Sequence, residues 1–385
     1  MKILMISPQF RPLVGGYERA AERLSAQLAK RGHEVTVYAE HRDHDWAREE
    51  IRDGVRVRRW WCKYARRWHS PTSSIGLAWL LVRHGRNFDV WHVHRNGLTA
   101  SITIIVGVFL ARPVVVKLTS TGPDSIARSL ERGLMPRVTS ALHRRASAIV
   151  ALTRDMVMEA TSFGVSQDRI RLIPNGVDLT NFSAATELTS LLARQSLGLN
   201  AEKVAVSIGR LAHQKQLTCL IAAWAHVYRR LDDSWVLVVV GDGPERPLLE
   251  ASVESLGLQN VVRFVGHSSQ IRDWLHAADM FVQSSSNEGL SNTMLEALAT
   301  GLPVVCTDVS GAQECVNDPQ TGIVVPVGDS AALAEAIVSL ASDEARRAEM
   351  SARAVALIRD RYSIEHVAEL HEQLYETLSR DTTPR

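Results

Sequence analysis

The 385-residue chain has little cysteine, few aromatic residues and no long hydrophobic run. Its four cysteines, Cys62, Cys219, Cys306 and Cys315, form no Cys-x-x-Cys pair and no Cys/His cluster at metal-ligand spacing. This usage predicts reduced, structural thiols. No segment approaches the roughly 18 apolar residues that a membrane-spanning helix needs. The opening MKILMISPQF is too short and too interrupted for a signal peptide, so it predicts a first strand and a cytoplasmic location.

The chain also lacks a Gly-x-Gly-x-x-Gly sequence after a predicted strand, which argues against a dinucleotide-dependent oxidoreductase. What it has is an alternation of short apolar runs with amphipathic stretches, such as the helix predicted over residues 16–30. The apolar runs of the first half are KILMIS, EVTVYA, VRVRRW, VWHVH, PVVVKL, AIVALT and RLIP. This alternation is typical of a parallel sheet covered by helices on both faces.

The same alternation restarts after a polar stretch at residues 178–201. The runs of the second half are VAVSIG, WVLVVVG, VVRFVG, MFVQSS, LPVVCT and TGIVVPV, with a helix predicted over residues 216–230. A chain of this length favours two cores. The fold class predicted is α/β, with two Rossmann-like, doubly wound domains that meet near IPNGVDLTNF and face each other across a cleft. Ligands of such sheets bind at the carboxyl ends of the strands.

Charge divides the chain unevenly. Residues 1–150 carry 25 Lys and Arg against 12 Asp and Glu, whereas residues 151–385 carry 19 against 30. Residues 56–69, RVRRWWCKYARRWH, gather six of these cations with three tryptophans and Tyr64. Cationic and aromatic side chains together suit an anionic membrane surface. We expect peripheral membrane contact there and no nucleic-acid partner, although a strand with a basic loop and a nucleic-acid site are the alternative interpretations.

Two cations follow the first strand of the second half, in SIGRLAHQKQL. Arg210 offers a planar fork and Lys215 a mobile point charge, a combination that suits a diphosphate. The alternative is a pair of solvated surface cations. Glycines of VGG, including Gly15 and Gly16, and of GDGP, Gly241 and Gly243, are further candidates for phosphate loops.

Two carboxylates, Glu288 and Glu296, frame the segment EGLSNTMLE. A helix is expected to begin near Ser291 or Asn292, because both are good N-cap residues, and its free N–H groups form an anion site. Glu296 lies one turn inside a helix whose small and apolar residues predict burial, so its carboxylate needs a partner. The alternative is an ordinary loop glutamate and an ordinary helix glutamate.

In the first half, His92 and His94 alternate along a strand and therefore point to the same face. Two histidines without a third ligand are a weak metal signal, and no metal site is predicted. The run at residues 98–111, LTASITIIVGVFLA, is too short to span a bilayer and predicts a buried helix.

Taken in order, GG at residues 15–16, IPNGVD, GRLAHQK, VGDGP and the Glu-x7-Glu segment EGLSNTMLE resemble the family-4 group of retaining, nucleotide-sugar-dependent glycosyltransferases with the GT-B fold. The resemblance spans nearly the whole chain. It implies an acceptor-binding domain at residues 1–175, a nucleotide-sugar domain at residues 176–362, and a carboxyl-terminal helix at residues 363–385 that packs back on the first domain.

The resemblance also implies roles for residues. Glu296 would bind the nucleotide ribose, and Glu288 would contact the transferred sugar. Arg210 and Lys215 would hold the diphosphate. Backbone groups of the loop and helix start, at Gly289, Leu290, Ser291 and Asn292, would help them, and the loop at Gly16 would close on the phosphates or sugar.

The chain departs from the family pattern at two positions. Thr119, in KLTSTG, stands where many relatives have a histidine near the reacting sugar, and Gln216 replaces a glycine after the family lysine. Thr119 is therefore a positional candidate on the acceptor side, together with Gly15 and His94.

The activity implied is retaining transfer of a sugar, with UDP-sugar the expected donor, to a lipid-linked or glycan acceptor in cell-surface polysaccharide or glycolipid biosynthesis. No cofactor and no metal are expected to be required. Two alternatives remain: a nucleotide-sugar epimerase or hydrolase, and a non-catalytic nucleotide-sugar-binding protein.

Overall fold

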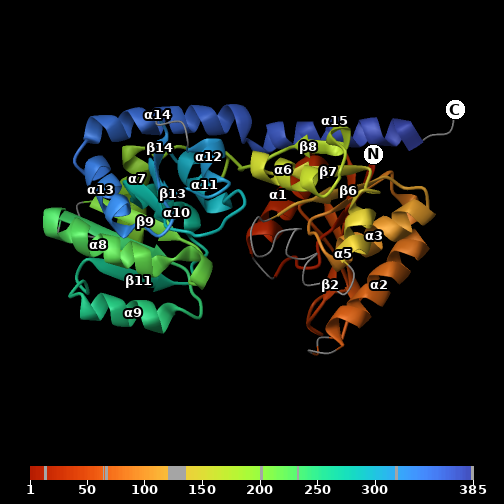
Figure 1. The fold of residues 1–385 in the computed structure, drawn as a ribbon, viewed down its shortest axis with the longest axis horizontal. Coiled ribbons are helices and arrows are strands. Elements are labelled where there is room, and N and C mark those ends of the chain that lie inside the picture. The colour runs from red at the N-terminus through yellow and green to blue at the C-terminus, as the bar shows by residue number, and fades with distance from the viewer. Residues whose placement is uncertain are drawn as a thin grey trace. The chain divides into compact units, whose positions relative to one another are not determined.

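The computed structural model describes residues 1–12, 15–63, 65, 68–119, 136–199, 203–231, 234–316 and 320–382. The chain divides into two compact units (Figure 1). Unit 1 comprises Met1–Gly176 with Ile364–Arg385, and unit 2 comprises Val177–Ser363. The boundaries predicted at 175/176 and 362/363 each lie one residue from these.

Unit 1 alternates strands with helices. Its elements are β1 (Lys2–Ile6), α1 (Gly16–Lys30), β2 (Glu34–His41), β3 (Glu49–Arg52), β4 (Val55–Trp61), α2 (His69–His84), the 3-10 helix η1 (Gly85–Asn87), β5 (Val90–Val93), α3 (Leu98–Phe109), β6 (Val114–Lys117), α5 (Pro136–His143), β7 (Ala148–Ala151), α6 (Arg154–Ser162), the 3-10 helix η3 (Gln167–Arg169), β8 (Ile170–Leu172) and α15 (Ile364–Thr382).

Within the described residues, the sheet of unit 1 has eight strands in the order β3-β4-β2-β1-β5-β6-β7-β8. All neighbours are parallel except β3, which pairs antiparallel with β4. Central strands such as β5 and β6 are buried at every residue, as expected for a sheet covered on both faces. Helix α15, from the far end of the chain, contributes Val367, Ala368, Leu374 and Tyr375 to this core.

Unit 2 repeats the arrangement. Its elements are α7 (Glu187–Ser196), β9 (Lys203–Ile208), the 3-10 helix η4 (His213–Lys215), α8 (Leu217–Leu231), β10 (Trp235–Val240), α9 (Arg246–Ser255), β11 (Val262–Gly266), α10 (Ile271–Ala277), β12 (Met280–Gln283), α11 (Asn292–Ala299), β13 (Val304–Thr307), α12 (Ala312–Cys315), β14 (Gly322–Val325), α13 (Ser330–Ala341) and α14 (Glu344–Arg361).

Six parallel strands form the sheet of unit 2 within the described residues, in the order β11-β10-β9-β12-β13-β14. Aliphatic residues of β9 and β10 pack with α8 and α13 into one core, around Leu220, Trp224, Leu237 and Ile337. The first strand, β9, lies in the middle, with later strands added first on one side and then on the other. The point where this order reverses, between β9 and β12, is where open α/β sheets bind ligands.

The predicted fold class is confirmed as two Rossmann-like units with parallel sheets. Sequence reasoning gave no strand at β3 and no helix at α2 or α7. It also expected the run at residues 98–111 to be a buried helix, whereas α3 has an exposed side that includes Leu98, Ile105 and Phe109. All four cysteines are free thiols, as predicted. In the described part of the chain, no helix is both long enough and apolar enough to cross a membrane.

Candidate active site

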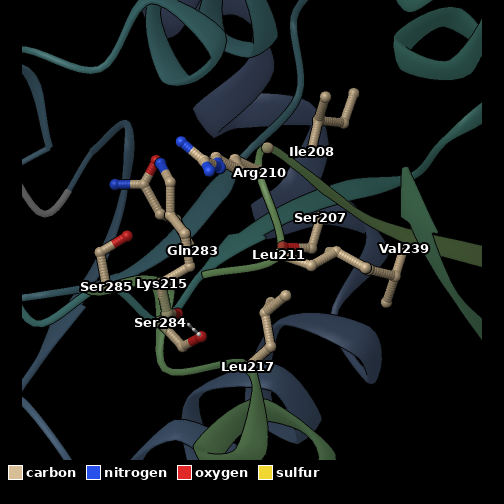
Figure 2. Close-up of a pocket in the computed structure, with 11 residues that line it drawn as sticks. Ser207, Ile208, Arg210, Leu211, Lys215, Leu217, Val239, Gln283, Ser284 and Ser285 are labelled. Carbon is tan, nitrogen blue, oxygen red and sulfur yellow. Dashed lines mark hydrogen bonds between the residues drawn. The ribbon is translucent and has the colours of Figure 1, made fainter. Parts of the chain in front are cut away.

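A pocket lies in unit 2 where the strand order reverses. It is lined from the carboxyl end of β9 by Ser207 to Leu211, from the end of η4 by Lys215, from the start of α8 by Leu217, from β10 by Val239, and from the carboxyl end of β12 by Gln283 to Ser285 (Figure 2). Because β9 and β12 are parallel neighbours, their carboxyl ends open on the same edge of the sheet. The structure thus brings together two segments that are about 70 residues apart in the sequence.

The β9 side supplies the two predicted cations. Arg210 is exposed, whereas the Lys215 side chain is 19% exposed. A Cβ atom at Gly209 would lie only 3.3 Å from Lys215 Cε, so the glycine leaves room for the lysine side chain to lie across the strand end. Lys215 closes η4 and is followed by Gln216 in the left-handed conformation, with φ of 44°. This turn directs the lysine toward β12.

Lys215 and Glu288 form an ion pair across the pocket. The Ser285 hydroxyl donates to the same carboxylate, with 3.0 Å between Oγ and Oε1. Ser284 Oγ donates to the backbone carbonyl oxygens of Lys215 and Gln216 at 2.9 and 3.1 Å. The serines therefore hold the loop after β12 against the turn that carries the lysine, and the pair is positioned from both strands.

Helix α11 begins beside this pair. Ser291 is its N-cap, with its Oγ accepting from the Met294 N–H, and the same hydroxyl donates to Gln283 Oε1 at 2.8 Å. The prediction of a helix start at Ser291 or Asn292 is confirmed. The first N–H groups of the helix and its positive end lie at the carboxyl edge of the sheet, an arrangement that favours an anion.

Glu296 is fully buried in α11, as predicted from its small and apolar neighbours. Taking a carboxylate out of water is costly unless polar groups compensate it. Glu296 lies in the same segment as the buried Leu290 and the helix start at Ser291, so its position in the structure is fixed together with theirs.

The predicted glycines at 241 and 243 have a steric reason for being there. A Cβ at Gly241 would lie 1.8 Å from the Gly209 carbonyl oxygen, and one at Gly243 would lie 2.2 Å from that of Leu211. The loops after β9 and β10 therefore pack backbone against backbone. In the same way Gly311 presses on Gly289, where an added Cβ would lie 2.0 Å from the carbonyl oxygen. These glycines shape the loops that line the site.

The predicted acceptor-side residues lie in unit 1. Gly15 is the N-cap of α1, and Gly16 is the first residue of that helix; Val14, the residue before them, lies outside the described residues. A Cβ at Gly15 would lie 2.3 Å from Oε2 of Glu18, a residue of the first turn that is buried and whose pKa is raised by burial. Thr119 is half-buried and follows β6.

His94 does not lie at the surface, as an acceptor contact would need to. Its ring is 1% exposed and lies 4.2 Å from that of His92, so the prediction that the two share a face is confirmed. His371 of α15 stacks on His92 at 5.3 Å, and Tyr375 Oη is 2.6 Å from His92 Nδ1. Burial holds the pKa of His92 and His94 well below the ordinary value. Burial likewise lowers the pKa of His371 to about 3.

One group of potential metal ligands converges in the described part of the chain: Glu40, Cys62 and His69. The Arg42 guanidinium lies 2.5 Å from Glu40 Oε2, and Ser73 Oγ donates to Oε1 at 2.6 Å. Burial, and next the nearby Glu40 charge, raise the pKa of the Cys62 thiol to about 11. The Glu40 carboxylate is thus already paired with the Arg42 guanidinium and the Ser73 hydroxyl, and the Cys62 thiol stays protonated. We therefore interpret this group as a structural contact between β2, β4 and α2.

The basic stretch at residues 56–69 is less available than its composition indicates. Arg58 and Arg59 pair with Glu49 and Glu50 of β3, and Trp60 is buried. Arg66 and Arg67 lie outside the described residues. The strand β3, which sequence reasoning did not predict, thus neutralises two of the cations.

Sequence reasoning also missed three functional candidates. Gln283 lines the pocket and is 4% exposed, and its Nε2 has no acceptor among the described residues. Ser285 orients Glu288. Glu18 lies in the segment GGYE, where a carboxylate in the first turn of a helix was a readable signal. Gln283 gave no such signal, because it ends an otherwise apolar strand.

Two family models together match most of the chain. Residues 191–356 match the model described as Glycosyl transferases group 1, and residues 14–181 match Glycosyltransferase Family 4. Glycogen synthase of Mycobacterium tuberculosis is 30% identical over 90% of this chain and 87% of its own length. The lipopolysaccharide core biosynthesis mannosyltransferase LpsB of Rhizobium meliloti is 29% identical over 77% and 81%. The structure of Anabaena HepE in complex with UDP-glucose superposes with a TM-score of 0.80 at 23% identity, covering 99% of this chain and all of that one.

Proposed function

Because this chain belongs to glycosyltransferase family 4 and has the GT-B fold, we propose that it transfers a sugar from a nucleotide-diphosphate sugar to a hydroxyl group of a glycan or lipid-linked acceptor, with retention at the anomeric carbon. The observation that carries the donor assignment is that Arg210 and Lys215 line one pocket, while the start of α11 is joined to the same pocket by the hydrogen bond from Ser291 to Gln283. Three sources of positive potential at one strand edge suit a diphosphate.

The chemistry follows from the charges that change during transfer. Breaking the bond between the anomeric carbon and the diphosphate oxygen leaves positive charge on the sugar ring and negative charge on the diphosphate. Lys215, Arg210 and the N–H groups that open α11 would stabilise the diphosphate as it leaves, which lowers the barrier without the need for a metal ion. Glu288, on the other side of Lys215, would lie near the sugar.

The ion pair between Lys215 and Glu288 indicates how the donor would enter. A diphosphate competes for the lysine, so its arrival releases Glu288 to accept hydrogen bonds from sugar hydroxyls. Ser285 then keeps the freed carboxylate oriented through its hydroxyl group. Glu296 would accept from the ribose hydroxyls deeper along α11, and Gln283 Nε2 is a further donor for an oxygen of the ligand.

The comparisons favour particular substrates. The HepE structure contains UDP-glucose, which supports a UDP-sugar as donor. LpsB is named for lipopolysaccharide core biosynthesis, which supports a lipid-linked glycan as acceptor and a role in cell-surface polysaccharide or glycolipid biosynthesis. The excess of cations in residues 1–150 is consistent with an anionic acceptor bound by unit 1.

A thermal-shift screen with UDP-, GDP- and ADP-sugars tests the donor assignment, with the free sugars as controls. We expect one nucleotide series to raise the melting temperature and the Lys215→Ala variant to lose that shift. A shift that persists in Lys215→Ala would overturn the site. Product analysis with the nucleotide sugar that gives the shift then distinguishes a transferase from an epimerase or hydrolase, because the latter two convert the donor without any acceptor.

A further inference from the structure

Unit 1 carries an exposed apolar surface on α2 and α3. On α2, exposed side chains recur at Ile75, Trp79 and Val82, with Trp79 61% exposed. On α3 they recur at Leu98, Ile105 and Phe109, with Phe109 77% exposed. Spacings of three, four and seven residues place each set on a single helical stripe.

Both stripes point away from the sheet. Of the buried residues of α2, Leu77 and Leu81 lie on the side of the helix opposite Trp79, and Leu80 lies on its flank. The buried residues of α3, which include Ala100, Ile104 and Gly107, are likewise opposite Phe109. The two helices pack against each other and cover the same face of the sheet, as Figure 1 shows for unit 1. We call these two stripes, Ile75, Trp79 and Val82 with Leu98, Ile105 and Phe109, the α2/α3 surface.

The charged residues of α2, α3 and the turns beside them are mostly cationic. Neither helix contains Asp or Glu, and residues 54–119 carry eleven Lys and Arg against a single acidic residue, Asp89. Of these cations, Arg58 and Arg59 pair with Glu49 and Glu50 of β3, and Lys117 is buried. Asp89 accepts from the Lys2 backbone N–H at 2.7 Å. The α2 stripe continues into the exposed Arg83 and Arg86, and Arg95 is exposed just before the α3 stripe. Arg83 lies over the Trp79 ring, 5.6 Å from its centroid.

We propose that the α2/α3 surface docks on an anionic phospholipid membrane. Two exposed apolar stripes on neighbouring helices are more than the scattered single apolar residues that a monomeric soluble protein usually exposes. A tryptophan on an apolar stripe beside arginines suits the boundary between acyl chains and headgroups, where the ring lies at headgroup depth and the cations contact phosphates. A self-association surface would gain nothing from a rim of like charges, because two copies would place those arginines against one another.

This proposal extends the proposed function, since docking would deliver a lipid-linked acceptor to the enzyme. It also moves the membrane contact from residues 56–69 to the helices that follow. Trp68, which is exposed at the N-cap of α2, is the residue that joins that stretch to the α2/α3 surface.

The test is sedimentation of the full chain with vesicles of phosphatidylcholine, with and without phosphatidylglycerol, in the absence of nucleotide. We expect binding to the anionic vesicles only. The double variant Trp79→Ser with Phe109→Ser should need about tenfold more lipid for half-maximal binding. The matched control, Leu188→Ser with Leu248→Ser on α7 and α9 of unit 2, removes apolar side chains of similar exposure and should bind as the parent does.

A second pair of variants tests the charged rim. Arg83→Gln with Arg86→Gln should weaken binding to anionic vesicles and remove most of its dependence on salt. Parent-like binding by Trp79→Ser with Phe109→Ser, or no binding by the parent, would overturn the proposal. So would a parent that is dimeric in light scattering and becomes monomeric in that double variant, because a second copy would then be the occupant.

Donor binding provides the independent readout. The thermal shift caused by the nucleotide sugar, measured without vesicles, should be the same in the parent and in all these variants, because none of the substituted residues lines the donor pocket. A variant that loses vesicle binding but keeps the thermal shift with the nucleotide sugar would show that the substitution affects the α2/α3 surface and not the donor pocket. A parent that binds vesicles and no nucleotide sugar would contradict the proposed function and leave the docking surface standing.

Discussion

The two units of the chain both have a mainly parallel sheet between helices, but unit 2 keeps a lysine accessible at its pocket, whereas unit 1 buries one. In unit 2, Lys215 ends η4, and its side chain is partly exposed and paired with Glu288 beside a pocket. In unit 1, Lys117 is the last residue of β6, but it is 3% exposed, and burial lowers its pKa to about 8. No ion pair of Lys117 is found among the described residues. One lysine is therefore available to a ligand, and the other is sealed.

The contrast extends to the surroundings of the two lysines. Beneath the pocket, the core of unit 2 is apolar, and polar groups such as Lys215, Gln283 and Ser285 lie at the edge of the sheet. Near Lys117, three histidines and Tyr375 are enclosed between β5 and α15. Unit 1 has a buried apolar core as well, and it also exposes apolar side chains along α2 and α3. Unit 2 thus keeps charged groups accessible at its pocket, whereas unit 1 uses polar contacts to hold a helix from the far end of the chain.

The sharpest test of this contrast is removal of the accessible lysine. Lys215→Ala should lower kcat about 100- to 1000-fold, because it removes one cation from the leaving diphosphate. The measurement is steady-state transfer with the donor identified by thermal shift. Lys203→Ala is the matched control: Lys203 opens β9 at the opposite edge of the sheet and pairs with Asp279. Near-normal turnover in Lys215→Ala would mean that the ion pair with Glu288 only joins two loops.

The second test acts on the sealed cluster of unit 1 through pH. Burial, followed by the Lys117 charge, lowers the pKa of His371 from its ordinary 6.5 to about 3. Below pH 6.5 the unfolded chain therefore binds a proton that the folded chain does not, so stability falls as the pH is lowered toward 3. At pH 5 the loss from His371 alone is about 2 kcal/mol.

Hydrogen exchange at pH 7 and pH 5, corrected for intrinsic rates, measures where this loss occurs. Protection should fall in β5, β6 and α15 of unit 1 and less in β9 and β10 of unit 2. A His371→Leu variant should show a shallower pH dependence. An equal fall of protection in both units would break the comparison, because it would show that the enclosed histidines are not the source.

Most of the fold was readable from the sequence, because a parallel sheet turns buried strands into uninterrupted apolar runs. WVLVVV and VVCT are examples. The misses have a common cause. Strand β3, EEIR, is an edge strand with exposed residues, so it gave no apolar run. Helix α2 was hidden because its stripe of Ile75, Trp79 and Val82 faces outward, where the usual pattern of buried and exposed positions is inverted.

The donor site was predictable to the level of motifs but not of contacts. Spacing and the strand-loop-helix order indicated Arg210, Lys215 and Glu288. The pairing of Lys215 with Glu288 depends on β9 and β12 being neighbours, and the sequence alone does not give strand order. The same reason hid the histidine cluster, since His371 is 279 residues from His92 along the chain and reaches it only because α15 packs on β5.

A third test concerns the buried carboxylate of unit 2. Glu296→Gln keeps the volume of the side chain and removes its charge, so the proposed hydrogen bonds from the ribose lose their charge assistance. We expect the dissociation constant for the nucleotide to rise about tenfold and kcat to change much less. Isothermal titration with the nucleotide diphosphate measures it, and Glu349→Gln, on the exposed face of α14, is the control. An unchanged affinity would assign Glu296 to the packing of α11.

The smallest effect expected is at Gln216, where the backbone of the pocket is strained. Its φ of 44° is left-handed, and its side-chain amide oxygen is buried without a donor among the described residues. Gln216→Gly should therefore stabilise the chain by about 1 kcal/mol in chemical denaturation, because relief of strain exceeds the added freedom of the unfolded chain. Asp53 of unit 1, with φ of 50°, is the matched position. Asp53→Gly should change stability less, since aspartate tolerates this conformation better than glutamine does. If Gln216→Gly also lowers transfer activity, the strained turn positions Lys215, and the accessible lysine of unit 2 is held at a cost in stability.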